Sequence, residues 1–404
     1  MSDASLIRPS GTFSPQAGRR ATNDTRAELP LAPHGGERVA EGRVRGASLR
    51  LVSLDVFRGA TVASMLLVNN PGSWGAIYWP LDHAEWHGWT PTDLIFPFFL
   101  FIVGITTELS RKEPLKILRR GALIILCGLL LNAFPYFHLS TLRFSGVLQR
   151  IGVVYILAAL IARYCSKKVM IAITVIILLG YWFILTRGPL EPPDATVAAS
   201  IDRAVLAPNH IWKSAKTWDP EGPLSTIPAI ATSLCGVLMT PWVRERDIKK
   251  LTAVGLMGVA IGLAWHVWFP INKNLWTSSY VVFTAGFACV LLAICIWVID
   301  IRGVVRASGA PPAEGAPEAR TTPGWTRPFV VYGVNPLIAF LGSGAMARLM
   351  GIIRIGGKTL HAWTYKPFKV FEPHIASLLW ALAFVAFWWA ILEVLYRRNI
   401  ILKV

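Results

Sequence analysis

The sequence has few charged residues for its length. Across 404 residues only 16% are Asp, Glu, Lys or Arg, whereas 54% are hydrophobic, and the mean hydropathy is +0.50. A globular core of this size needs far less apolar material. The shortage of charge therefore argues against an ordinary water-soluble domain, and we predict an all-α, polytopic protein with the lipid bilayer as its solvent.

Cysteine motifs are also missing. Five cysteines lie singly, in or beside apolar runs, without any CxxC or His–Cys spacing: Cys127, Cys165, Cys235, Cys289 and Cys295. This pattern excludes a disulfide framework and a structural zinc site. We expect buried free thiols and no metal.

Negative charge is the scarcer sign, and the formal net charge is +17. In a soluble protein this excess would suggest nucleic acid, but here Lys and Arg gather in short clusters between apolar runs, which indicates membrane topology and no nucleic-acid partner. Residues 1–50 contain eight arginines and lack an apolar run long enough for a signal-peptide core. We expect a disordered, Arg-rich cytoplasmic tail over 1–50 and a membrane domain over 51–404.

Ten apolar runs are long enough to cross a bilayer. They cover 51–69, 92–109, 117–134, 146–164, 168–186, 223–242, 251–269, 276–299, 328–350 and 375–395. The tail, the loops after even-numbered spans and the C-terminus together hold 27 Lys and Arg, against eleven on the opposite face. The positive-inside rule therefore predicts about ten transmembrane helices with both termini cytoplasmic.

Three polar, aromatic segments fall at the non-cytoplasmic ends of the spans. They cover residues 69–89, 218–222 and 272–277. An interfacial aromatic belt accounts for their Trp residues, but it does not account for Asp, Glu, Lys, Asn and His in the same segments. We therefore expect an outward-facing polar cavity.

Ionisable residues inside spans are costly and are often functional. Arg150 lies about a turn into the fourth span, where an anionic ligand or a buried carboxylate is its natural partner. Asp55 and Arg58 share a helix face, either as a paired anchor of the helix end or as a binding pair. Asp93, at the outer start of the second span, either interacts with free helix amides or orients a histidine.

Two of the eight histidines stand out. His83 and His87 flank Trp86 in a loop without Lys or Arg, just before Asp93. A histidine here suits a general base that removes a proton from an amine or a hydroxyl. Two histidines could also bind a metal, but no third ligand lies at a convincing spacing.

These residues carry a resemblance to a known family. The ordered segments RLVSLDVFRG at 50–59, VN at 68–69, HAEWHG at 83–88 and TDLIFP at 92–97 resemble the heparan-α-glucosaminide N-acetyltransferase family of transmembrane acyltransferases and its bacterial relatives. The segments GVLQRI at 146–151, DPEGPLST at 219–226, NKNLWTS at 272–278 and GVNP at 333–336 agree with it. The resemblance covers about residues 50 to 400.

The resemblance implies a reaction across the membrane. Cytoplasmic acetyl-CoA would supply an acetyl group, and the amine of a glucosamine-type sugar would receive it on the periplasmic face of a bacterial inner membrane. The family's active-site histidine corresponds to His83 and its asparagine to Asn69. The resemblance also implies a homodimer. We expect no counterpart here of the large luminal N-terminal region of the animal enzymes, and we expect a bacterial relative to use another periplasmic amino sugar or glycan as acceptor.

The remaining candidate site residues are polar or aromatic. For sugar or cofactor recognition we select Trp86, His87, Gln149, Arg150, Asp219, Glu221, Lys273, Asn274 and Trp276, and Asp93 joins His83 and Asn69 as a catalytic candidate. The sequence does not separate direct transfer from an acetyl-histidine intermediate. Two other functions stay open: an amino-sugar transporter or sensor without acyl chemistry, and an O-acyltransferase of periplasmic glycans.

Overall fold

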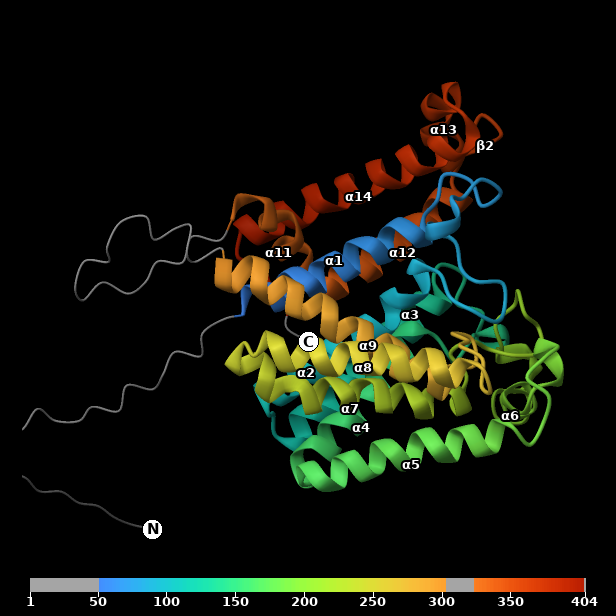
Figure 1. The fold of residues 1–404 in the computed structure, drawn as a ribbon. Coiled ribbons are helices and arrows are strands. Elements are labelled where there is room, and N and C mark those ends of the chain that lie inside the picture. The colour runs from blue at the N-terminus through green and yellow to red at the C-terminus, as the bar shows by residue number, and fades with distance from the viewer. Residues whose placement is uncertain (1–50, 303–322, 403–404) are drawn as a thin grey trace, which may run out of the picture. The chain divides into compact units, whose positions relative to one another are not determined.

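The computed structural model describes residues 51–302 and 323–402, and within them the regular secondary structure is almost entirely helical (Figure 1). By its internal contacts the chain divides into residues 1–49 and 50–404. The described residues belong to the second unit. The predicted Arg-rich tail lies outside the described residues, so its disorder stays a prediction.

Thirteen α-helices are formed by the described residues. They are α1 (Val52–Asn69), α2 (Ile95–Ser110), α3 (Pro114–Ala133), α4 (Val147–Tyr164), α5 (Lys167–Leu185), α6 (Val197–Leu206), α7 (Pro223–Glu245), α8 (Ile248–His266), α9 (Ser278–Cys295), α11 (Arg327–Val334), α12 (Pro336–Ile352), α13 (Leu360–Tyr365) and α14 (Pro373–Arg397). A 3₁₀ turn, η2 (Pro91–Leu94), leads into α2, and a π-helical segment, η6 (Ile296–Ile301), continues α9. A short hairpin pairs β1 (Arg354–Ile355) with β2 (Lys358–Thr359).

The predicted all-α, polytopic membrane fold is confirmed. In the described ranges eight helices are long and apolar enough to cross a membrane, or nine if the pair 324–334 and 336–352, bent by 74°, forms one span. The predicted count of ten is one higher, and the difference is α3. This helix forms where a span was predicted, but Lys116, Arg119 and Arg120 lie near its start and make it too polar to count with the others.

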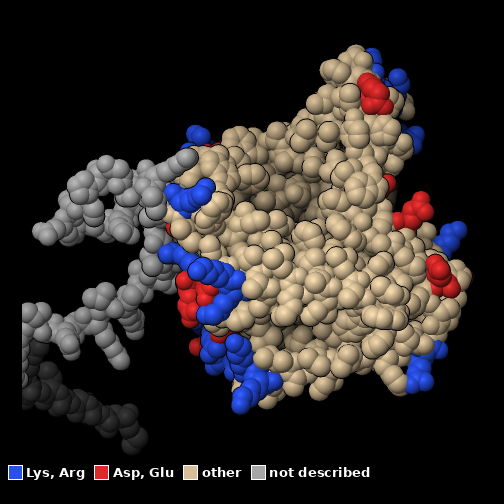
Figure 2. All heavy atoms as spheres, in the orientation of Figure 1, with Lys and Arg blue, Asp and Glu red and all other residues tan. Residues whose placement is uncertain are grey.

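The exposed surface agrees with a lipid environment. Charged side chains gather at the two ends of the helices and leave a broad uncharged band between them (Figure 2). Large apolar side chains are exposed on that band, including Leu126, Ile176 and Phe387. Water would penalise such a surface, whereas lipid tails solvate it.

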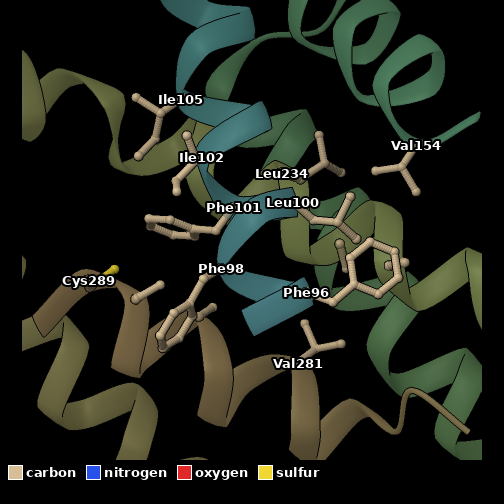
Figure 3. Close-up of a cluster of buried hydrophobic side chains, with 14 of the residues drawn as sticks. Phe96, Phe98, Leu100, Phe101, Ile102, Ile105, Val154, Leu234, Val281 and Cys289 are labelled. Atoms are coloured by element: carbon tan, nitrogen blue, oxygen red, sulfur yellow. The ribbon is translucent and has the colours of Figure 1, made fainter. Parts of the chain in front are cut away.

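The core is built around α2. Leu100, Phe101 and Ile102 are 0–1% exposed, and Figure 3 shows the α2 side chains among those of α4, α7 and α9. Elsewhere α1 and α11 approach closely at Gly59, where a Cβ atom would lie 1.7 Å from the Phe329 carbonyl oxygen. Only glycine allows this backbone contact. It brings the first motif, at 50–59, against the GVNP motif, and Arg58 Nε donates to the Gly333 carbonyl at 2.7 Å.

Candidate active site

The loop between α1 and η2 presents His83. Its return to the membrane is fixed by a capping box, in which Thr90 and Asp93 exchange side-chain and backbone hydrogen bonds. The Asp93 Oδ2 atom accepts from the Thr90 amide at 3.1 Å and from the Ala84 amide at 3.0 Å. Asp93 therefore interacts with free amides at the helix start, as one of the two predicted alternatives states.

The Asp93 carboxylate also contacts a histidine, as the second predicted alternative states. Its Oδ1 atom lies 2.7 Å from His83 Nδ1. The Asp93 side chain is 2% exposed and the imidazole is 45% exposed. A carboxylate can only accept, so the proton of the neutral imidazole belongs on Nδ1 and the lone pair on Nε2. This tautomer leaves Nε2 as the base of an oriented His–Asp pair.

Lys273 completes the cluster. Its Nζ atom lies 3.0 Å from His83 Nδ1, 3.1 Å from His83 Nε2 and 3.6 Å from Asp93 Oδ1. Asn272 holds the turn that presents it, because Asn272 Oδ1 accepts from the Leu275 amide at 2.9 Å. Burial lowers the pKa of Lys273, while the charges of Asp93 and Glu221 oppose that shift. Lys273 was predicted to recognise sugar or cofactor, and in the structure its ammonium group contacts the His83 ring.

His87 has different surroundings. Its Nδ1 atom lies 3.3 Å from the Asn272 side-chain nitrogen, and its Nε2 atom lies 3.7 Å from Glu191 Oε2. Burial lowers the pKa of His87, with Glu191 acting in the opposite direction. The neighbouring Trp86 donates to the Leu190 carbonyl at 2.9 Å and packs edge-on against Trp218. These contacts hold the loop in place and give His87 no equivalent of Asp93.

Asp219 and Glu221 are bound to Arg143, which the sequence reasoning did not select. The guanidinium lies 2.8 and 2.5 Å from the two Asp219 oxygens and 2.5 Å from Glu221 Oε2. Asp219 also accepts from the Trp212 and Glu221 amides. Both of its oxygens are therefore used within the protein. In this arrangement Asp219 is bonded within the protein, and its recognition of sugar or cofactor stays a prediction.

Trp276 is also engaged within the protein. It was expected to cover a sugar face, but it is 1% exposed and lies edge-on to Phe96 and Tyr280. Its indole donates to Thr232 at 3.1 Å, and the Arg150 guanidinium lies 4.9 Å from its ring centre. Its faces are closed by protein, so it belongs to the core.

Arg150 is 2% exposed and donates to the Pro220 carbonyl at 2.8 Å and to Ser225 at 2.5 Å. Within the part of the chain that the structure describes, Arg150 Nη1 and Gln149 Nε2 are buried donors without an acceptor. Buried donors without a partner are costly and indicate that a ligand or water completes them. The binding of sugar or cofactor by Gln149 and Arg150 stays a prediction.

The two asparagines make fewer contacts. Asn69 is the last residue of α1 and is exposed, and Asn274 is partly buried next to Lys273. Neither side chain forms a hydrogen bond within the described residues. Both are free to meet a ligand, and their roles stay predictions.

A cavity of about 320 Å³ lies between α1, α2, α3, α4 and α12. One end of it is cationic, with Arg58, Lys112 and Arg120. Its walls are mostly apolar and include Val62, Met65, Phe99, Leu148, Ile151 and Phe340. Burial and the nearby Arg120 charge lower the pKa of Lys112, and Arg120 Nε has no acceptor within the described ranges. The cationic end is thus arranged to receive an anion.

The sequence analysis did not predict this cavity. Neither Lys112 nor Arg120 was selected as a candidate site residue. The signal that could have found it is a cation inside an apolar run, the criterion already applied to Arg150. Within residues 51–302 and 323–402, no three His, Cys, Asp or Glu side chains converge as metal ligands would.

Comparison with known proteins agrees with the motifs. The family model described as heparan-alpha-glucosaminide N-acetyltransferase, catalytic, matches residues 50–253. The chain belongs to this family. It is 28% identical to the heparan-alpha-glucosaminide N-acetyltransferase of Homo sapiens over 443 aligned positions, and 26% identical to that of Mus musculus over 442. These alignments cover 90% and 89% of this chain and 61% of each relative, so the chain spans about three fifths of their length. His83, Asp93, Arg150 and Glu221 all lie within the part matched by the heparan-alpha-glucosaminide N-acetyltransferase family model, whereas Lys273 lies beyond it.

Proposed function

We propose that the protein is a transmembrane N-acetyltransferase that moves the acetyl group of cytoplasmic acetyl-CoA to the amine of a glucosamine-type sugar. The observation that carries this proposal is the position of two features on the same helices. Arg58 is near the start of α1 and Lys112 follows the end of α2, whereas His83 follows α1 and Asp93 precedes α2. The cationic end of the cavity and the His–Asp pair are therefore at opposite ends of helices about 25 Å long.

Acetyl-CoA fits the cavity in its chemistry. Its phosphates need cations, which Lys112 and Arg120 offer, and its pantetheine arm suits an apolar wall. Leu148, Ile151 and Tyr155 of α4 contribute to that wall. Family membership supports the same donor, and the cationic loops favour the cytoplasm as its source.

His83 is the group that moves the proton. The acceptor amine attacks the thioester carbonyl carbon as His83 Nε2 takes a proton from the amine nitrogen. The carbon–sulfur bond then breaks, the amide remains on the sugar, and the proton on Nε2 goes to the departing thiolate. Asp93 holds the ring and stabilises the imidazolium, and Lys273 supplies positive charge where the carbonyl oxygen becomes negative. Asn69 and Asn274 are available to bind acceptor or thioester oxygens.

The test is acetyl transfer by purified protein from labelled acetyl-CoA to glucosamine. We expect the native chain and the His87→Ala variant to form N-acetylglucosamine. The His83→Ala variant should bind acetyl-CoA and form none. An ester product would change the assignment to an O-acyltransferase. No binding of acetyl-CoA, together with uptake of glucosamine into vesicles, would replace the enzyme with a transporter.

The setting of this reaction is inferred from topology and resemblance. We infer that the His83 face is periplasmic in a bacterial inner membrane, with a second copy of the chain as partner. Fusion of a periplasm-active reporter enzyme at loop position 86, compared with position 247, tests the orientation. Activity at position 247 alone would reverse it.

A further inference from the structure

A second large cavity lies at the same end of the helices as His83. It measures about 330 Å³ and is lined by the ends of α3 and α12 and by the segments around residues 134–143 and 212–213. It shares no lining residue with the acetyl-CoA cavity. Three cations line it, namely Arg143, Lys213 and Arg348, and its lining includes no carboxylate.

The positive charge of this cavity is only partly balanced. Arg143 is paired with Asp219 and Glu221. Among the described residues, neither Lys213 nor Arg348 has a carboxylate within ion-pair distance. Arg348 is one helical turn after Gly344, and a Cβ atom at Gly344 would lie 3.2 Å from Leu131 of α3. Arg348 is therefore on the side of α12 that faces α3, which directs its charge toward the cavity.

The approach to the cavity is apolar. Leu123, Leu126 and Leu130 are 38–51% exposed along one face of α3, and that helix ends at the cavity. Tyr136 and Leu139, beside the cavity, are 64% and 70% exposed. In a membrane protein such a stripe contacts acyl chains, and aromatic side chains lie at the headgroup level. A cationic cavity at the end of an acyl-contacting stripe matches a molecule that joins acyl chains to a phosphate.

We propose that this cavity binds the phosphate headgroup of an anionic phospholipid, whose acyl chains lie along α3. Lys213 and Arg348 hold the phosphate, and Trp212 and Tyr136 flank the headgroup. The site is independent of acetyl transfer, so its failure would leave the proposed enzyme untouched.

The test is binding of phosphatidylglycerol to the delipidated, detergent-purified chain, measured by native mass spectrometry with phosphatidylcholine as the neutral reference. Lys213→Ala and Arg348→Ala should each weaken phosphatidylglycerol binding about fivefold, the change expected for one cation near an anionic surface. Arg348→Lys should retain most of the binding. Lys369→Ala removes a cation from the α13–α14 connection, away from the cavity lining, and should have no effect.

Two results would overturn the proposal. The first is equal binding of phosphatidylglycerol by the native chain and by both alanine variants. The second is displacement of the lipid by inorganic phosphate or by an acidic disaccharide at equal concentration, because the cavity would then be a site for a soluble anion or a glycan. Thermal unfolding of each variant shows whether it is folded, so loss of binding is not confused with loss of structure.

Discussion

At the scale of single residues, the His83 imidazole and two side chains beside it have different roles. Asp93 is buried and accepts from Nδ1, Lys273 faces both ring nitrogens, and the ring itself is half exposed. The buried carboxylate already fixes the tautomer, so no free energy of reorganisation is needed to place it during the reaction. This arrangement also explains why we assign the base to His83 and not to His87, since the polar neighbours of the His87 ring are Asn272 and, 3.7 Å away, Glu191.

The substitution Asp93→Asn tests the role of Asp93 in orienting His83. The amide keeps the size of the carboxylate but cannot stabilise the imidazolium, so we expect the turnover number to fall by about 10²–10⁴ with unchanged affinity for acetyl-CoA. Asp82→Asn is the matched control, because the Asp82 carboxylate accepts from the His83 backbone amide and makes no other hydrogen bond within the described residues. The double variant His83→Ala, Asp93→Asn should be no worse than His83→Ala. Additive losses would mean that Asp93 acts separately from the histidine.

Asp202 gives a prediction about pH. Burial raises its pKa to about 7, with the Asp219 charge adding to the shift and the Arg150 and Arg203 charges opposing it. The native state therefore holds a proton that the unfolded state, with a pKa near 4, has released. Stability attributable to this group falls as pH rises from about 4 to about 7, by up to roughly 4 kcal/mol.

The measurement is thermal unfolding in one detergent at pH 5 and pH 8. Asp202→Asn keeps an acceptor for the Asp219 amide, so it should flatten the pH dependence and be more stable than the native chain at pH 8. Asp194→Asn, at an exposed position on the same segment, should change neither value. A native chain that gains stability between pH 5 and pH 8, with Asp202→Asn unchanged, would contradict this account.

At the scale of elements, the sequence predicted where helices form better than which ones cross the membrane. The apolar runs predicted helices at 51–69 and 146–164, and the structure has α1 at Val52–Asn69 and α4 at Val147–Tyr164. Periodicity could not show that the ninth run is bent by 74° before Pro336, or that α3 uses its first turns to line a cationic cavity. Both depend on neighbours far away in sequence.

The contribution of Lys112 and of Arg120, on α3, to donor binding can be measured. Replacing both Lys112 and Arg120 by Ala should raise the KM for acetyl-CoA at least tenfold, since each removes a charged contact to phosphate. Acetyl-pantetheine lacks the nucleotide phosphates, so its KM should not change. Lys116→Ala removes an exposed cation of the same helix that pairs with Glu113, and should leave both values unchanged. Equal effects on both thioesters would mean that the helix is damaged and not that phosphate contacts are lost.

At the scale of the whole molecule, the order of motifs predicted the candidate site only in part. The sequence placed His83, Asp93 and Lys273 in outer segments, and the structure joins them. It could not show that Asp219 is held by Arg143 or that Trp276 is enclosed in the core, because both facts depend on contacts between segments far apart in the sequence. The polar residue types in the sequence predicted the region of the candidate site. Only tertiary contacts show whether a polar side chain there is available to a ligand or already bonded within the protein.

The central claim is that one chain passes an acetyl group from one side of the membrane to the other. It is tested most directly in sealed vesicles, with labelled acetyl-CoA outside and glucosamine trapped inside, and with His83→Ala vesicles as the control. The account predicts labelled N-acetylglucosamine inside the native vesicles while the CoA stays outside, and none in the control. Product that forms only when donor and acceptor share one compartment would contradict it.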